Sequence, residues 1–438
     1  MANLIPFRGV LYDPAVVKDV SKVVAPPYDI IDAEYQRALH ARHPHNIVRL
    51  ELGQDGAGDT AAENRYSRAA SALADWLRSG VLKRDTNPSV YLLMIDYQAP
   101  SSSPGGRRTL KGFLSTVELE EFGTGKIFPH ENTRSAAKAD RLSLLEACRA
   151  NFSPIFSLYS DPEGRVLDLL ERSVDLNKPR IDFHDDEGFR QRLWSISDPR
   201  VLEQAGALMK AKPLFIADGH HRYETALRYR ELRKASEKTG AAIQPHDAVL
   251  MLFSSLEDPG LTVLPTHRVL TNALGDTAKV TALLTDAFMI RETPVSGNDR
   301  EARGRFLHDL RTRGQSQVVF GLALRGAATY LLLELRPDRH PDSSTVERDK
   351  LDVSILQQLV ITKLCPTAAE QEAIVYTKDD DEALDLVRNG KAEGALLLNP
   401  TKVSEVRAVA ASGGRMPHKS TYFFPKPLTG LVINAMEP

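Results

Sequence analysis

Apolar positions recur at two spacings along the chain and predict a mixture of helices and strands. One predicted helix has apolar residues at helical spacing, namely Tyr66, Ala70, Leu73 and Leu77. Gly80 is placed to close this helix. The run 91–97 is almost continuously apolar, which is typical of a buried strand. The Pro-, Ser- and Gly-rich stretch 99–108 then indicates a hairpin loop or a domain boundary.

The middle of the chain continues with both kinds of element. The predicted strands are 112–119, 154–159 and 214–217. The predicted helices are one with Leu142, Leu145 and Cys148 on one side, one over 165–172, and one that Ser197 or Asp198 caps and that runs through Lys210. The segment 176–192 is charged and weakly periodic, so we expect an excursion from the core there.

The C-terminal part has the pattern of an α+β domain. Its predicted strands are 248–254, 261–264, 317–324, 329–335 and 394–398, and its predicted helices are 276–287, 299–313, 381–389 and a short one after Pro400-Thr401. A chain of 438 residues exceeds the roughly 250–300 residues at which one core stops growing. We therefore expect a multidomain α/β (α+β) protein, with an N-terminal α/β region at 1–104, a core at 105–240 and a C-terminal α+β domain at 241–438.

Charge and cysteine content exclude several classes of protein. The 56 basic and 58 acidic residues give a net charge of −2, which provides no overall field for a nucleic acid or an anionic membrane. The two cysteines, Cys148 and Cys365, are too few for a disulfide framework and lack zinc-site spacing. No signal peptide or membrane-length apolar run is visible. We expect a cytoplasmic protein without nucleic-acid or membrane partners, and the pattern does not predict its oligomeric state.

The strongest candidate site is the segment DGHHR, which consists of Asp218, Gly219, His220, His221 and Arg222. It joins the buried strand at 214–217 to a helix, so Gly219 permits close approach of a ligand and the first helical turn offers unpaired N–H groups. Phosphate suits such a turn, since Arg222 adds a planar donor and Asp218 is able to hold a divalent cation. Alternatively, Asp218 only caps the helix and the histidines pack. A zinc site is disfavoured because no cysteine lies nearby.

Two weaker candidates flank this segment in the sequence. His130 and Glu131 follow a predicted strand, so Glu131 is a candidate general base, although a solvated loop glutamate is the simpler interpretation. A glycine-led loop carries Lys419, Ser420 and Thr421, which suit a carboxylate or phosphate but also an ordinary surface turn. The segment APPYD at 25–29 is interpreted mainly as core structure. Neither a Walker loop at Gly125-Lys126 nor an HExxH zinc motif is complete.

These motifs carry two resemblances to known families. From APPYD through PHENT and ADGHHRYETA to MPHKSTYFFPK, the chain resembles a large bacterial family, domain of unknown function 1015. It is also similar to the free L-serine kinases of the partition-protein-B/sulfiredoxin-like superfamily, in which Pro-His-Glu precedes Asp-Gly-His-His-Arg and Lys-Ser/Thr-Thr follows near the C-terminus. All three motifs occur here in that order. The resemblance implies a sulfiredoxin-like core at 105–240 and a loop at 151–200 that leaves this core and returns.

The second resemblance also implies a reaction and a role for each matched residue. The reaction is phosphorylation of a small hydroxyl compound, with free L-serine as the expected acceptor, ATP or ADP as the donor and Mg²⁺ as the metal. Glu131 is implied as the base, and Asp218 and His221 as further catalytic residues, with Asp218 near the metal. Gly219, His220, His221 and Arg222 would surround the phosphates. His130, Lys419, Ser420 and Thr421 would bind the amino acid or the nucleotide.

Three other functions share parts of this pattern. Sulfiredoxin chemistry needs a cysteine where His220 stands. A nucleotide-switched DNA clamp of the partition-protein-B type needs a basic helix-turn-helix, which the sequence does not show. A noncatalytic nucleotide sensor or a phosphatase would use the same anion pocket, and these remain the alternatives to a kinase.

Overall fold

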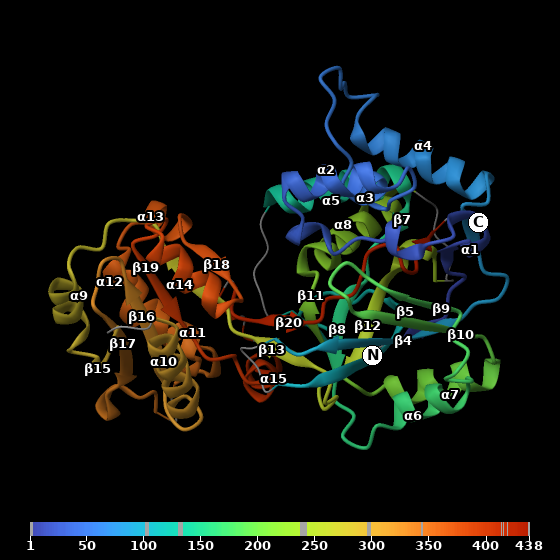
Figure 1. Cartoon of the computed structure of the whole chain (residues 1–438). Coiled ribbons are helices and arrows are strands. Elements are labelled where there is room, and N and C mark those ends of the chain that lie inside the picture. The colour runs from blue at the N-terminus through green and yellow to red at the C-terminus, as the bar shows by residue number, and fades with distance from the viewer. Residues whose placement is uncertain are drawn as a thin grey trace. The chain divides into compact units, whose positions relative to one another are not determined.

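The chain folds into two compact units of mixed α/β structure (Figure 1). The computed structural model describes residues 3–100, 105–129, 135–236, 243–295, 299–342, 345–412, 414, 416–417 and 419–436. Unit 1 contains Met1–Ala99, Gly105–Thr262 and Pro425–Pro438, whereas unit 2 contains Pro100–Pro104 and Val263–Phe424. The chain therefore leaves unit 1, builds most of unit 2 and returns to unit 1 with its C-terminal segment.

Unit 1 is built on a nine-stranded sheet with the strand order β6-β11-β8-β12-β5-β4-β10-β9, and β1 also pairs with β5. The strands are β1 (Leu4–Ile5), β4 (Val90–Gln98), β5 (Arg107–Glu118), β6 (Ile127–Phe128), β8 (Ile155–Tyr159), β9 (Ile181–His184), β10 (Arg190–Ile196), β11 (Leu214–Asp218) and β12 (Ala248–Ser255). Two pairs, β6 with β11 and β8 with β12, are parallel, and the other pairs are antiparallel. The predicted loop at 99–108 thus joins the antiparallel hairpin β4–β5.

The helices of unit 1 come from every part of its sequence. They are α1 (Pro14–Val17), α2 (Ala33–Arg42), α3 (Val48–Glu51), α4 (Arg65–Arg78), α5 (Ser135–Cys148), α6 (Arg165–Arg172), α7 (Pro199–Met209) and α8 (His220–Ser236). Two small sheets, β2 (Val10–Tyr12) with β3 (Leu82–Arg84) and β7 (Ala150–Asn151) with β21 (Asn434–Ala435), complete the unit. Helix α8 contacts α5 and the strands β8 and β12, as Figure 1 shows.

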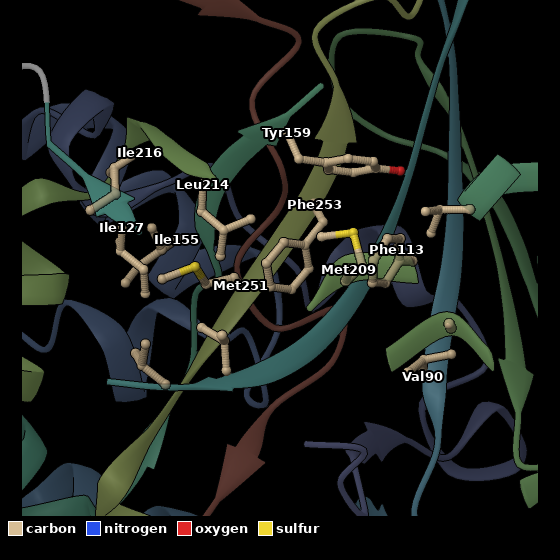
Figure 2. Packing of buried hydrophobic residues seen from close by; sticks show 14 of the residues in the cluster. Val90, Phe113, Ile127, Ile155, Tyr159, Met209, Leu214, Ile216, Met251 and Phe253 are labelled. Carbon is tan, nitrogen blue, oxygen red and sulfur yellow. The ribbon is translucent and has the colours of Figure 1, made fainter. Parts of the chain in front are cut away.

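Alternate residues of the strands form the core of unit 1. Ile155 and Tyr159 of β8 and Met251 and Phe253 of β12 are fully buried in one cluster (Figure 2). Successive side chains of a strand point to opposite faces, so this spacing of two or four residues directs them to one face of the sheet. The cluster also includes Tyr223 of α8, which fixes this helix against the sheet.

Two sequence-based expectations differ from the observed sheet. The segment 176–192 is not an excursion, because it contains β9 and most of the hairpin with β10, which extends the sheet beside β4. The expected loop at 151–200 likewise contains β8, which lies between β11 and β12. Strands from all three regions distinguished in the sequence, 1–104, 105–240 and 241–438, lie together in this one sheet.

Unit 2 is an α+β unit around a six-stranded antiparallel sheet with the order β15-β17-β16-β19-β14-β18. Its strands are β14 (His267–Leu270), β15 (Phe288–Pro294), β16 (Val319–Leu324), β17 (Thr329–Leu335), β18 (Val375–Thr377), β19 (Gly394–Leu397) and β20 (Tyr422–Phe424), and β13 (Thr262–Leu264) begins at the division between the units. Its helices are α9 (Thr277–Leu284), α10 (Asp299–Arg313), α11 (Asp352–Leu356), α12 (Thr362–Leu364), α13 (Ala368–Glu372), α14 (Asp380–Arg388) and α15 (Val403–Ala411). Across the described part of the chain, no helix combines the length and the apolar character needed to cross a membrane.

Two glycines give a matched test of the packing in unit 1. A Cβ atom added to Gly112 of β5 would lie 2.6 Å from the backbone oxygen of Phe253, whereas nothing lies within 4 Å of one added to Gly206 of α7. We expect Gly112→Ala to lower the free energy of unfolding by about 1–3 kcal/mol through overpacking. Gly206→Ala should raise it by roughly 0.5–1 kcal/mol, because alanine loses less backbone entropy in a helix. Urea denaturation measures both values, and effects of the same sign would contradict this packing.

Candidate functional site

The DGHHR segment forms the strand-turn-helix that its sequence predicts. Strand β11 is buried from Leu214 to Ala217, and helix α8 begins at His220. Gly219 makes the turn with φ of 94°, in the left-handed region that favours glycine. A Cβ atom there would also lie only 3.0 Å from the guanidinium of Arg222. The turn therefore needs glycine both for its backbone conformation and for the position of Arg222.

Tyr223 anchors the first turn of α8 to the segment that follows β5. Its hydroxyl donates to the backbone oxygen of Glu120 at 2.8 Å and accepts from the N–H of Glu120 at 3.0 Å. The ring is fully buried and stacks on Phe122, with ring centroids 5.0 Å apart. The positive end of the helix dipole is thus held in a fixed position beside Asp218.

Asp218 lies between two cations. Arg222 Nη2 donates to Asp218 Oδ2 at 2.6 Å, and Lys426 Nζ donates to Oδ1. The side chains are largely buried, with 16% of Asp218 and 9% of Lys426 exposed. Burial alone would raise the pKa of the Asp218 carboxyl, but Lys426 and Arg222 lower this pKa to about 2. Asp218 is therefore ionised at neutral pH.

Lys426 also joins Asp218 to the N-terminal part of the chain. Its ammonium lies 3.4 Å from Asp29 Oδ2, so two carboxylates share one buried cation. The backbones of Ala25 and Thr429 hold these segments together through two hydrogen bonds of 3.2 and 2.8 Å. The segment APPYD, interpreted mainly as core structure, thus also brings a carboxylate to the site. We call Asp29, Asp218, Arg222 and Lys426 the Asp218 cluster.

The adjoining residues of APPYD and α5 form a second charged group. The guanidinium of Arg141 lies over the ring of Tyr28, 4.3 Å from its centroid. Burial raises the pKa of Tyr28 to about 12, so its hydroxyl stays protonated at neutral pH. Arg141 also pairs with Asp140 at 2.6 Å and with Glu51 at 3.2 Å. This part of unit 1 is therefore rich in charges that are paired and buried.

The predicted general base, Glu131, and its neighbour His130 lie outside the described residues. The elements on either side of them are described. Strand β6 ends at Phe128 and runs parallel to β11, with Phe128 paired to Phe215. Parallel strands end at the same edge of a sheet, so the chain leaves β6 at the edge that carries Asp218. After the undescribed residues, α5 begins at Ser135 and lies against α8.

The predicted loop with Lys419, Ser420 and Thr421 belongs to unit 2, whereas the DGHHR turn belongs to unit 1. The hydroxyl of Ser420 donates to the backbone oxygen of Pro417, and Thr401 donates to the backbone oxygen of Ser420 at 3.0 Å. Arg268 donates to the backbone oxygen of Lys419 at 3.3 Å, and Lys419 itself is exposed with φ of 57°. The loop is thus fixed by one hydrogen bond of its own and by two from Thr401 and Arg268, and the Lys419 side chain is exposed.

The Asp218 cluster fits Mg²⁺ only together with phosphate. Asp29 and Asp218 face one cation, and Mg²⁺ at nucleotide sites is commonly held by one or two carboxylates plus substrate phosphates. Among the described residues, no three His, Cys, Asp or Glu side chains are grouped so that they could hold a metal ion. The described residues of the cluster therefore provide two carboxylates and no complete metal site.

The sequence interpretation did not include Lys426, Asp29, Tyr28 or Arg141 among the site residues. Lys426 directly follows Pro425 in YFFPKP, and Asp29 lies two residues after Pro27 in APPYD. For Lys426, a charged residue between two prolines in an otherwise apolar segment was the available signal, because burial of such a residue requires a partner. No comparable signal marks Arg141 within α5.

Comparisons with known proteins identify a family and distant structural relatives. A family model described as "Protein of unknown function (DUF1015)" matches residues 4–354. No curated protein matches the chain. Similar solved structures include a conserved hypothetical protein from Pyrococcus furiosus, with 14% identity and a TM-score of 0.35 over 73% of this chain and 93% of that one.

Two further structures are similarly distant. One is a free serine kinase in complex with AMP, with 14% identity and a TM-score of 0.35 over 71% of this chain and 86% of that chain. The other is SbnI with a C-terminal truncation from Staphylococcus aureus, with 12% identity and a TM-score of 0.35 over 72% of this chain and 85% of that chain. Likeness at this level assigns no activity.

The charge balance at Asp218 predicts a pH dependence of stability. The folded-state pKa of about 2 lies below the ordinary value of 3.8, so the carboxylate stabilises the fold above about pH 4. This contribution, about 2 kcal/mol by linkage, is lost as the pH falls toward 2. The free energy of unfolding of Asp218→Asn should thus approach that of the unchanged protein between pH 4 and pH 2.

The measurement is denaturant unfolding at a series of pH values. Asp168→Asn on α6 serves as the control, because the Asp168 side chain is 60% exposed and pairs with Arg172 only at 3.6 Å. It should change the free energy of unfolding by less than about 0.5 kcal/mol at every pH. A stability difference for Asp218→Asn that does not change with pH would exclude the ion pairs as its source.

Proposed function

The chain belongs to the protein family of unknown function DUF1015, and we propose that it is a nucleotide-dependent kinase acting on a small hydroxyl compound. The proposed acceptor is free L-serine, the donor is ATP or ADP, and the product is O-phospho-L-serine. The observation that carries the proposal is the Asp218 cluster, in which two largely buried cations lie at the start of a helix. Lys426 and Arg222 are both bound to Asp218 there.

The chemistry of phosphoryl transfer suits this cluster. The protein mainly has to position the reactants and stabilise charge on the transferred phosphoryl group. Arg222 provides a planar donor for phosphate oxygens and Lys426 a compact one, and the N-terminus of α8 adds positive potential. Asp218 and Asp29 would hold Mg²⁺ together with the phosphates, and the ion would neutralise part of their charge.

The motif order assigns the remaining roles in this proposal. The Glu131 carboxylate takes the proton of the acceptor hydroxyl, whose oxygen bonds to the terminal phosphorus of the nucleotide. The bond from that phosphorus to the bridging oxygen breaks, and ADP or AMP leaves. His220, His221 and the Gly219 backbone contact phosphate groups, and His221 assists the transfer. His130, Lys419, Ser420 and Thr421 bind the acceptor or the nucleotide.

Thiol chemistry is a poor alternative for this chain. Both cysteines are free and buried. Burial raises the pKa of Cys148 to about 12 and also raises the pKa of Cys365. Since the thiolate is the reactive form, neither cysteine is suited to redox catalysis at neutral pH. A nucleotide sensor or a phosphatase would use the same cations and is separated from a kinase by the test below.

The direct test is to incubate the full chain with Mg²⁺, ATP or ADP, and L-serine within a panel of small hydroxyl compounds. Mass spectrometry measures O-phosphoserine. Glu131→Gln should reduce the rate by roughly 10²- to 10⁴-fold, because general base catalysis contributes that much. Asp218→Asn should also abolish most of the activity, whereas Asp168→Asn on α6 should leave it unchanged.

The other outcomes of this assay point to the alternatives. If the protein binds nucleotide but phosphorylates no acceptor, and if Glu131→Gln leaves the nucleotide affinity unchanged, the protein is a sensor. Release of inorganic phosphate from phosphorylated compounds without nucleotide indicates a phosphatase. Either result removes the kinase proposal.

A pair of lysine variants tests the phosphate role of Lys426. Lys426→Met should weaken nucleotide binding roughly 10- to 100-fold, the loss expected for one hydrogen bond to a charged group. Lys212→Met is the matched control, because Lys212 is a partly buried lysine of unit 1 that pairs with Asp161 at 3.0 Å. Calorimetry measures the nucleotide affinity of both variants. An equal loss of nucleotide affinity in both variants would show that the effect comes from lower stability and not from the loss of a phosphate contact.

A further inference from the structure

Unit 1 contains a small polar cavity beside the Asp218 cluster. Its volume is about 40 Å³, and a single water needs only about 10–15 Å³ on this measure. The polar residues that line it are Glu51, Arg141, Asn151, Ser153, Arg222 and Thr225, and the rest of the lining is mainly apolar. The cavity has room for a small polar group but not for a nucleotide.

Two buried polar atoms of the lining have no partner among the described residues. They are the hydroxyl of Thr225, whose residue is 3% exposed, and Nε of Arg222. A buried donor without a hydrogen bond destabilises a fold, and most such groups in proteins are paired. Both atoms belong to residues that line this one cavity, which points to a ligand that supplies the missing acceptor.

The third polar feature of the cavity is the buried pair of Glu51 and Arg141. Arg141 Nη1 donates to Glu51 Oε1 at 3.2 Å and to the Glu51 backbone oxygen at 2.9 Å, and Ser153 donates to the same Oε1 at 2.7 Å. Both contacts to the Glu51 side chain use the same carboxylate oxygen, Oε1. Within the described residues, Glu51 Oε2 has no hydrogen bond, so the cavity lining also includes a buried acceptor that is available to a cation.

The charges around the cavity favour a zwitterion over an anion. Arg141 is already paired with Asp140 and Glu51, and Arg222 is paired with Asp218. What remains unpaired is one carboxylate oxygen, one guanidinium N–H and one hydroxyl. We propose that this cavity binds the ammonium group of a small amino acid through Glu51 and its carboxylate group through Arg222 and Thr225.

Arg222 connects this cavity to the Asp218 cluster. The guanidinium lines the cavity, and its Nη2 donates to Asp218 Oδ2 at 2.6 Å. An amino acid bound to Arg222 Nε would therefore share one guanidinium group with Asp218, next to the cations where phosphate is proposed to bind. That this amino acid is the phosphoryl acceptor rests on the proposed function, whereas its binding does not. The small volume restricts the ligand to amino acids such as glycine, alanine and serine.

The test is calorimetric binding of glycine, L-alanine and L-serine to the full chain, with and without ADP. Two analogues, ethanolamine and lactate, each lack one of the two charges and should bind at least ten times more weakly than L-alanine. Thr225→Val should weaken amino-acid binding at least tenfold and leave nucleotide affinity unchanged. It should not lower the melting temperature, because it removes a hydroxyl that has no partner.

Ser157→Ala is the matched control variant. Ser157 of β8 is fully buried, its hydroxyl also has no partner among the described residues, and it does not line the cavity. This variant should bind amino acids as the unchanged protein does. Equal effects of Thr225→Val and Ser157→Ala, or no binding of any of the three amino acids, would overturn the inference and leave the cavity to solvent.

The two proposals fail in different ways. Binding of amino acids without transfer of phosphate to any of them keeps the cavity assignment and removes the acceptor role. If another hydroxyl compound is phosphorylated and Thr225→Val leaves the KM for that compound unchanged, the kinase proposal is kept and the cavity assignment is removed.

Discussion

The carboxylate of Asp218 must be neutralised, and much of unit 1 is arranged to do this. A largely buried charge without a partner costs several kcal/mol, so the strand β11 can end on Asp218 only if cations are present. Arg222 comes from the first turn of the following helix, four residues away. Lys426 comes from a segment 208 residues away and is itself shared with Asp29. Through Lys426, the Asp218 carboxylate thus ties two distant segments of the chain, around Asp29 and around Lys426, to the Gly219 turn.

Regular periodicity made most of the elements predictable. The helix α6 matches its predicted range, 165–172, and β4 and β17 differ from theirs by one residue or less at each end. The hairpin β9–β10 was missed because β9 is a short edge strand that alternates apolar with polar residues and β10 begins with Arg190, Gln191 and Arg192, a pattern that also fits an exposed loop. The pairs Arg190–Asp182 and Arg192–Asp96 balance those charges across strands, which only the folded register shows.

The candidate site was predictable only where its chemistry is local. The turn at Gly219 and the helix start follow from the order of residue types. The pairing of Arg222 with Asp218 lies within the same five residues but was not predicted, because Arg222 was assigned to phosphate. Lys426 and Asp29 belong to the same charge cluster, but their contact depends on the pairing of Ala25 with Thr429. The sequence also does not predict that the Thr225 hydroxyl lacks a partner among the described residues, because the pattern at this position is that of an ordinary buried residue of α8.

The return of the chain to unit 1 also orders events during protein synthesis. The ribosome completes β11, the Gly219 turn and α8 more than 150 residues before it adds Pro425–Pro438, which belong to unit 1. Until Lys426 emerges, Asp218 has Arg222 but lacks its second cation, and β7 lacks its partner β21. Nascent chains that stop within unit 2 therefore lack one of the two cations that pair with Asp218. The proposed activity thus becomes available only after unit 2 has been translated in full.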